Sequence, residues 1–347
     1  MEARRYDIDW IRVIAIGLLL LYHVAIGFQS WGMLIGFITT EQTWPSLWIP
    51  MSMLNVWRIP LLFFVSGMGA CFALRQRTWA QLLPERAKRI LLPFLFGMVA
   101  IVPIHVYLWQ QYNDLETGYA PGPGHLWFLG NLFIYVLFLT PLFYYLKRGG
   151  GKALARKAEV FMRSPLGLLP MFALFILEVL ILEPFPFERY AMTWHGFFLG
   201  LLAFFFGYFF VWCGAVFWNM LLRWRWLFLL AAATLFALRL SFFQSLAPNY
   251  LVSIESNCWV LAVFAFGYRH FNRPSCLLSY LSQAAYPVYI VHMVFLYLGS
   301  LLIFPLGMPV PLQFVLLLLF TFLSCFACYE LLIRRVRFIR PLFGLKT

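Results

Sequence analysis

The sequence contains very little charge. Of its 347 residues, 11% are charged and only 13 are aspartate or glutamate, whereas 63% are hydrophobic. A water-soluble protein with this composition would have too few polar side chains to cover its surface, so an ordinary soluble fold is excluded. The composition predicts a polytopic membrane protein. In such a protein, the net charge of +13 indicates a basic membrane face and not nucleic-acid binding.

Several other sequence signals are absent. The six cysteines lack the two spaced pairs of a zinc site, and the Cys325-Phe-Ala-Cys328 stretch lies in an apolar segment, so we expect packing cysteines and no metal site. The first apolar run is long enough to span a bilayer and lacks a cleavage pattern, which predicts a transmembrane helix and no signal peptide. The lack of an internal repeat disfavours an inverted-repeat transporter.

Long apolar runs are what the sequence does have. Ten of them are long enough to cross a membrane, and they lie at about 10–28, 54–74, 90–110, 126–146, 165–182, 194–212, 226–241, 250–268, 284–304 and 312–333. The sequence therefore predicts an all-α, polytopic, multi-pass membrane protein of about ten transmembrane helices. We expect a single membrane domain over residues 1–347, with a basic cytoplasmic linker at about 147–163.

The basic residues predict the orientation of these helices. In a ten-helix topology, all but three of the 26 lysines and arginines fall on the side that holds both termini. Because the positive side of a membrane protein is normally cytoplasmic, both termini are predicted to be inside. The exceptions are Arg58, Arg189 and Arg239. Arg58 and Arg239 are predicted near the outer ends of two helices, from where they can point toward the protein interior.

His23 is the first candidate functional residue. It lies in the first apolar segment, eleven residues after Arg12, so on a helix the two share a face about 16 Å apart. In one interpretation Arg12 is a surface anchor paired with Asp9, and His23 packs against other helices. In the other, neutral His23 accepts a proton from a substrate hydroxyl while Arg12 holds an anion at the cytoplasmic mouth.

Two arginines precede the third apolar segment. Arg86 and Arg89 lie one helical turn apart, where paired guanidinium groups suit a phosphorylated cofactor, although topology alone also places basic residues there. On the outer side, Glu255 begins the eighth segment near Arg239, where the seventh ends. A structural ion pair and a substrate site are both compatible with that spacing.

The remaining candidates are aromatic. His292 is a second histidine inside an apolar segment, and it either packs between helices or binds substrate. His125 and Trp127 follow a loop that is rich in acidic and aromatic residues and is predicted on the outer face. Such side chains suit the hydroxyls and ring faces of sugars, and they are also common at membrane interfaces.

Six motifs occur in order along the chain, namely DWIRVIAIGLLLLYH, WRIPLLFFVSGMGACF, RAKRILLPF, HLWFLGNLFIY, FGYRHFN and YLSQAAYPVYIVHMVFLYL. Together they resemble the acyltransferase 3 family of integral membrane acyltransferases. Within that family the chain looks closest to the glucan biosynthesis protein C branch, which succinylates periplasmic glucans. The resemblance implies that the FFVSG stretch at 63–67 is mainly architectural.

The resemblance implies transfer of an acyl group, acetyl or succinyl, from cytoplasmic acyl-CoA to a hydroxyl of an extracytoplasmic carbohydrate. It implies that His23 is catalytic and that Arg12, Arg86 and Arg89 bind the acyl donor. No cofactor is expected to be tightly bound, because acyl-CoA serves as a co-substrate. The expected partners are acyl-CoA, the carbohydrate acceptor and the lipid bilayer of a bacterial inner membrane, with no nucleic acid.

The residues and the resemblance together predict a mechanism with His23 as general base. Arg58 and Arg239 are expected to stabilise the oxyanion or to bind an acidic acyl group. Direct transfer and an acyl-histidine intermediate remain alternatives. The main alternative function is a transporter or flippase for an anionic or glycan-linked substrate, with His23, Arg58, Glu255 and His292 along its path. A scaffold or sensor that keeps the fold without the chemistry is a third.

Overall fold

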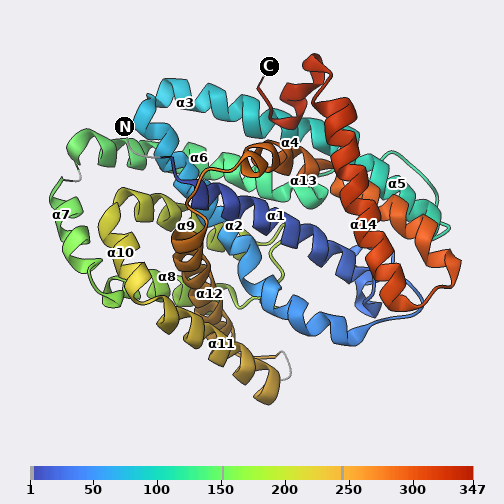
Figure 1. Cartoon of the computed structure of the whole chain (residues 1–347), viewed down its shortest axis with the longest axis horizontal. Helices are drawn as coiled ribbons and strands as arrows, with labels where there is room; N and C mark the ends of the chain where they lie inside the picture. Colours follow the sequence, from blue (N-terminus) through green and yellow to red (C-terminus); the bar gives the residue numbers. More distant parts are fainter. Residues whose placement is uncertain (1–3, 151, 244–245, 347) are drawn as a thin grey trace. The chain divides into compact units, whose positions relative to one another are not determined.

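The computed structural model describes residues 4–150, 152–243 and 246–346, and these contain helices and connecting turns but no β-strand. The α-helices labelled in Figure 1 are α1 (Tyr6–Ile26), α2 (Trp48–Gln76), α3 (Trp79–Arg86), α4 (Leu92–Phe96), α5 (Val102–Tyr112), α6 (Trp127–Tyr145), α7 (Lys152–Phe161), α8 (Leu169–Leu182), α9 (Trp194–Trp212), α10 (Ala215–Arg223), α11 (Arg225–Phe242), α12 (Asn249–His270), α13 (Cys276–Ile303) and α14 (Val310–Cys328). The prediction of an all-α fold is confirmed.

Ten helical segments within the described residues are long and apolar enough to cross a membrane. They are Tyr6–Ile26, Pro45–Gln76, Trp79–Tyr112, Gly124–Arg148, Pro165–Leu182, Trp194–Trp212, Arg225–Phe242, Asn249–His270, Cys276–Leu306 and Val310–Ile333. The predicted helix count is confirmed. The second, third and ninth segments begin earlier than predicted, because their first turns carry polar residues that hydropathy does not assign to a span. The orientation with both termini inside stays a prediction.

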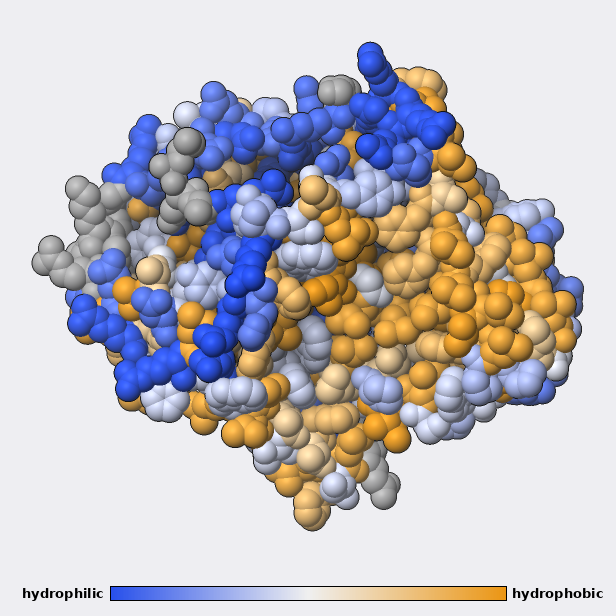
Figure 2. Space-filling view, viewed as in Figure 1, coloured by the Kyte–Doolittle hydropathy of each residue, from blue (hydrophilic) through white to orange (hydrophobic). Residues whose placement is uncertain are grey.

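The surface of α14 has the polarity of a lipid-facing helix. Leu312, Leu319 and Leu323 lie at helical spacing and are exposed, whereas Gln313 and Thr321 on the same helix are buried. Figure 2 shows hydrophobic side chains over the part of the surface where Figure 1 places this helix. A helix in water would present the opposite arrangement, so this pattern fits a bilayer.

The described residues form two compact units. Unit 1 comprises the described parts of Met1–Ala15, Asn55–Glu85 and Asn131–Leu278, and unit 2 those of Ile16–Leu54, Arg86–Gly130 and Ser279–Thr347. In unit 1, α12 packs against α8, α10 and α11. In unit 2, the C-terminal 3-10 segment Arg337–Phe343 packs along α4. The prediction of a single domain with a linker at 147–163, which contains α7, stays a prediction.

Tyrosine hydroxyls bind backbone carbonyls that prolines in the spanning helices leave without a helical hydrogen-bond donor. Proline has no N–H group, so the carbonyl four residues earlier loses its helical donor. In unit 1 the hydroxyl of Tyr190 donates to the carbonyl of Val56 at 3.1 Å, four residues before Pro60. In unit 2 the hydroxyl of Tyr119 donates to the carbonyl of Val99 at 2.9 Å, in a π-helical turn before the next proline. These proline-containing helices therefore keep the two carbonyls hydrogen-bonded.

Glycines bring α2 and α9 into backbone contact within unit 1. A Cβ atom at Gly67 would clash with the carbonyl of Phe204, and one at Gly207 would clash with the carbonyl of Phe64. The two contacts are reciprocal, so each helix presents a glycine to a phenylalanine backbone of the other. This close approach explains why the FFVSG stretch is built around a small residue.

Candidate functional site

Unit 2 gathers four of the six histidines of the chain into one group, which we call the histidine cluster. Its members are His23 of α1, His105 of α5, His125 of the 3-10 turn Gly124–Leu126 and His292 of α13. The sequence singled out three of them as candidates for a functional role. It did not single out His105.

The centre of the cluster is a hydrogen-bonded pair of imidazoles. Nδ1 of His23 lies 2.9 Å from Nε2 of His292. The two rings are nearly parallel, at an angle of 4° with centroids 5.1 Å apart. His292 is completely buried, whereas His23 is only partly buried. One ring of the pair is therefore accessible, and the other supports it from the protein interior.

Backbone carbonyls orient the buried rings. Nδ1 of His292 lies 2.6 Å from the carbonyl oxygen of Tyr289, one turn earlier on α13. Nε2 of His125 lies 3.0 Å from the carbonyl oxygen of Ile290. The hydroxyl of Tyr289 in turn donates to the carbonyl of His125 at 2.6 Å. Because a carbonyl oxygen can only accept, each of these ring nitrogens carries a proton.

Aromatic rings surround the pair. His23 packs against Phe37 and against its neighbour Tyr22, each with a ring-centroid distance of 5.7 Å. His292 packs edge to face against His125 at 4.9 Å. His105 extends the cluster, with its ring 5.4 Å from that of His125. These contacts restrict the rotation of the imidazoles and limit the access of water to them.

Arg86 and Arg89 lie at another place in unit 2, at the end of α3 and in the π-helical turn Ala87–Leu91. Both are partly exposed. Gly344, in the left-handed region at φ 70°, lies against the ring of Tyr286 and near the carbonyl of Arg89. The basic C-terminal residues therefore lie close to this turn, where Figure 2 shows hydrophilic side chains near the C-terminus.

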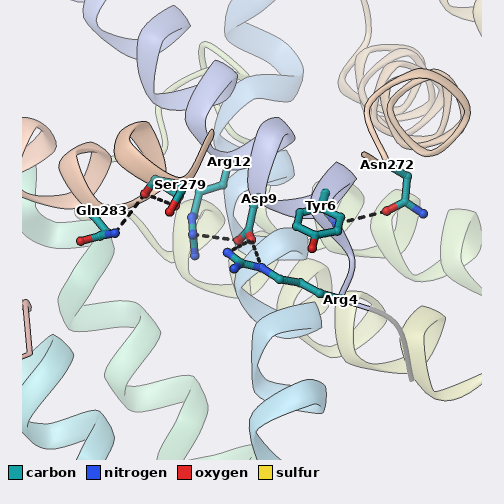
Figure 3. A network of polar contacts seen from close by, with 8 residues as sticks. Arg4, Tyr6, Asp9, Arg12, Asn272, Ser279 and Gln283 are labelled. Carbon is teal, nitrogen blue, oxygen red and sulfur yellow. Dashed lines mark hydrogen bonds and ion pairs between the residues drawn. The ribbon is translucent and has the colours of Figure 1, made fainter. Parts of the chain in front are cut away.

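Arg12 lies in an ion-pair network near the start of α1, in unit 1 (Figure 3). Its Nη2 is 3.0 Å from Oδ1 of Asp9, and Nη2 of Arg4 is 2.9 Å from Oδ2 of the same carboxylate. This confirms the pairing with Asp9. Helix α1 is unbroken, so Arg12 and His23 occupy one helix as predicted. Anion binding by Arg12 stays a prediction.

Unit 1 contains a buried ion pair between α11 and α12. Arg239 donates through Nε and Nη2 to the two carboxylate oxygens of Glu255, at 2.8 and 2.9 Å, and both side chains are buried. Oε1 of Glu188 lies 3.8 Å from Nη1 of Arg239. Burial raises the pKa of Glu188, although Arg239 partly opposes this effect. The geometry suits the structural interpretation of Arg239 and Glu255, and their binding of substrate stays a prediction.

Comparison with known proteins adds one decisive observation. The model of the acyltransferase 3 family, described as an acyltransferase domain, matches residues 5–330. The chain belongs to the acyltransferase 3 family. No curated protein and no solved structure matches it. Family membership and ten candidate spans make the chain a multi-pass membrane acyltransferase, which acts on an acyl donor and an acceptor.

In this acyltransferase 3 protein, the predicted site residues belong partly to unit 1 and partly to unit 2. His23, His125 and His292 meet in the histidine cluster of unit 2. Trp127 begins α6 just after the cluster, and its ring packs against that of Phe128. Arg58 is buried in the part of α2 that belongs to unit 1. The structure thus brings the three predicted histidines together within unit 2.

Sequence reasoning missed a second buried pair in this acyltransferase. Nδ1 of His195 on α9 lies 2.8 Å from Oε1 of Glu178 on α8, and both residues are buried within unit 1. A lone carboxylate in the fifth apolar segment and a histidine at the start of the sixth were the available signals, because ionisable groups inside a membrane need partners. The pair links two neighbouring helices.

Proposed function

We propose that this acyltransferase moves an acetyl or succinyl group from acyl-CoA on the cytoplasmic side to a hydroxyl of an extracytoplasmic carbohydrate, in a bacterial inner membrane. The observation that carries the proposal is the paired, partly exposed imidazole of His23. Its hydrogen bond to buried His292 holds the ring in place, as a general base requires. The motifs shared with the glucan biosynthesis protein C branch support a succinyl donor and a glucan acceptor.

In the proposed reaction, His23 removes the proton of the acceptor hydroxyl as the hydroxyl oxygen attacks the thioester carbon. A C–O bond forms and the C–S bond breaks. His23 then returns the same proton to the leaving sulfur, so the products are an ester and a free thiol. A single histidine serves both proton transfers, and the direct reaction needs no other acid or base.

Charged groups complete the proposal. Arg86 and Arg89 bind the phosphates of CoA, since each offers paired donors and both are partly exposed. Arg12 is proposed as a further ligand of the donor because it matches the family motif. Arg58 is proposed to face the oxyanion or an acidic acyl group, whereas Arg239 is proposed to remain in its structural ion pair with Glu255. No tightly bound cofactor enters this mechanism.

The test uses purified protein in nanodiscs with acetyl-CoA or succinyl-CoA and a linear glucan oligosaccharide. Free thiol and acylated sugar are measured separately. His23→Ala should reduce turnover by about 10²-fold or more, the share that general base catalysis contributes. His270→Ala, which removes an exposed histidine in unit 1, is the matched control and should retain turnover. Turnover that survives in His23→Ala would overturn the proposed base.

The same assay separates the donor site from the alternative function. Combined Arg86→Ala and Arg89→Ala substitutions should raise KM for acyl-CoA and leave KM for the sugar unchanged, because only the donor carries phosphates. An effect confined to the sugar would contradict the proposed donor site. A wild-type protein that releases no thiol but carries the sugar across a vesicle membrane would be a transporter.

A further inference from the structure

Two neutral imidazoles in contact can share only one proton in their hydrogen bond, so one ring donates and the other accepts. In the His23–His292 pair the contact joins Nδ1 of His23 to Nε2 of His292. The direction of this hydrogen bond decides which nitrogen of His23 carries a lone pair. The direction therefore decides which nitrogen can act as a base.

The carbonyl of Tyr289 settles the direction. It accepts from Nδ1 of His292 at 2.6 Å, so in neutral His292 the proton is on Nδ1 and Nε2 has the lone pair. Nε2 of His292 must then accept from Nδ1–H of His23. A neutral His23 with its proton on Nδ1 has its lone pair on Nε2. One backbone carbonyl thus fixes both rings.

The surroundings hold this arrangement in place. Tyr289 is itself anchored, because its hydroxyl donates to the carbonyl of His125 in the turn before α6. His125 contacts the ring of His292, with its own ring nearly perpendicular at 85°. His292 is completely buried. Rotation of the His292 ring would therefore break the contact with Tyr289 and disturb packing against His125.

We propose that His292 is a positioning residue that fixes His23 in the tautomer with Nδ1 protonated, so that Nε2 is the catalytic base. This inference rests on the proposed function of His23. When His23 takes the acceptor proton on Nε2, its Nδ1–H remains bound to His292. That hydrogen bond becomes charge-assisted and stabilises the transient imidazolium. His292 touches neither substrate, and it acts through His23.

Nitrogen NMR of ¹⁵N-histidine-labelled protein in nanodiscs tests the tautomer independently of activity. The His23 signals are assigned by their loss in His23→Gln. At a pH at which the rings are neutral, wild-type His23 should show a protonated Nδ1 and an unprotonated Nε2. A proton on Nε2 of neutral His23 would overturn the proposal. Wild-type protein that shows the expected tautomer but transfers no acyl group would refute the proposed function alone.

Substitutions of His292 connect the tautomer with turnover. His292→Leu should let His23 adopt both tautomers and lower kcat by roughly 10- to 100-fold, with KM for acyl-CoA and sugar unchanged. His292→Gln should restore part of the loss, because its side-chain oxygen can accept from Nδ1–H of His23. Equal activity of wild type and His292→Leu would contradict the positioning role.

A control variant distinguishes an effect on the His23 tautomer from a general effect on packing. His105→Leu also removes a buried imidazole of the cluster, but the His105 ring packs against His125 and Tyr297, whereas the hydrogen bond joins His23 to His292. We expect His105→Leu to leave the nitrogen signals of His23 unchanged. If His105→Leu shifts the tautomer as much as His292→Leu does, the effect is a packing effect and the proposal fails.

Discussion

The buried ion pair of unit 1 offers a quantitative test of whether Arg239 and Glu255 are structural. The variant Glu255→Gln keeps the shape of the side chain and removes its charge. Arg239 is then left with 2% of its side chain exposed and without its main counter-charge. Removing one partner of a buried pair typically destabilises a protein by about 3–5 kcal/mol.

Because Glu188 lies nearby, we expect the loss of stability to fall at the lower end of that range. Its Oε1 is 3.8 Å from Nη1 of Arg239. The carboxylate of Glu255 contributes to the raised pKa of Glu188. Removing that charge favours ionisation of Glu188, which then partly compensates Arg239. We therefore expect Glu255→Gln to lose about 3 kcal/mol, or roughly 6–12 °C in apparent Tm at ~2–4 °C per kcal/mol.

Thermal unfolding in nanodiscs, followed by intrinsic fluorescence, measures this loss. The matched control is Glu330→Gln, because Glu330 pairs with Arg334 at 2.9 Å in an exposed setting, with 37% and 51% of the side chains exposed. Water screens an exposed ion pair, so Tm should hardly change. Suppose that Glu255→Gln keeps its Tm but loses turnover with succinyl-CoA and not with acetyl-CoA. That result would refute the structural reasoning and favour substrate binding.

Three other predictions concern packing and pH. Gly207→Ala should force α2 and α9 apart at the carbonyl of Phe64 and lower thermal stability by about 1–3 kcal/mol. Burial raises the pKa of Glu188 above the ordinary 4.5, so the folded state holds this proton more strongly than the unfolded chain does. Stability should therefore fall as pH rises through the raised pKa. In curves of Tm against pH, Glu188→Gln should remove that decline. Gly344→Leu requires a strained φ of 70° and contact with Tyr286, so the C-terminal segment should detach and become more sensitive to trypsin.

Hydropathy alone predicted the spans because crossing a bilayer requires about 20 apolar residues in one helix. It could not predict that α1 and α13 are neighbours in unit 2. His23 and His292 are 269 positions apart, and both lie in long apolar segments. The choice of helix neighbours depends on small residues and shape, as at Gly67, which hydropathy does not report.

The candidate site was predictable in part. His23 and His292 could be found from sequence because a histidine in an apolar segment is unusual. The direction of their hydrogen bond could not be found from sequence, since it depends on the backbone carbonyl of Tyr289. Every residue has a backbone carbonyl, so the sequence does not mark this one. Glu178 and His195 are likewise visible in the sequence as ionisable residues in apolar segments, but only the structure shows that they pair with each other.

The use of a second histidine, in place of a carboxylate, has a physical consequence for the proposed chemistry. A carboxylate beside His23 would place a full charge in a helix interior of low dielectric, which is costly without further partners. Neutral His292, held by the carbonyl of Tyr289, orients the base without that charge. It also stabilises the imidazolium less than a carboxylate would. Such a base suits an activated acyl donor such as a thioester, whose thiolate leaves readily, better than it suits an amide or a simple ester.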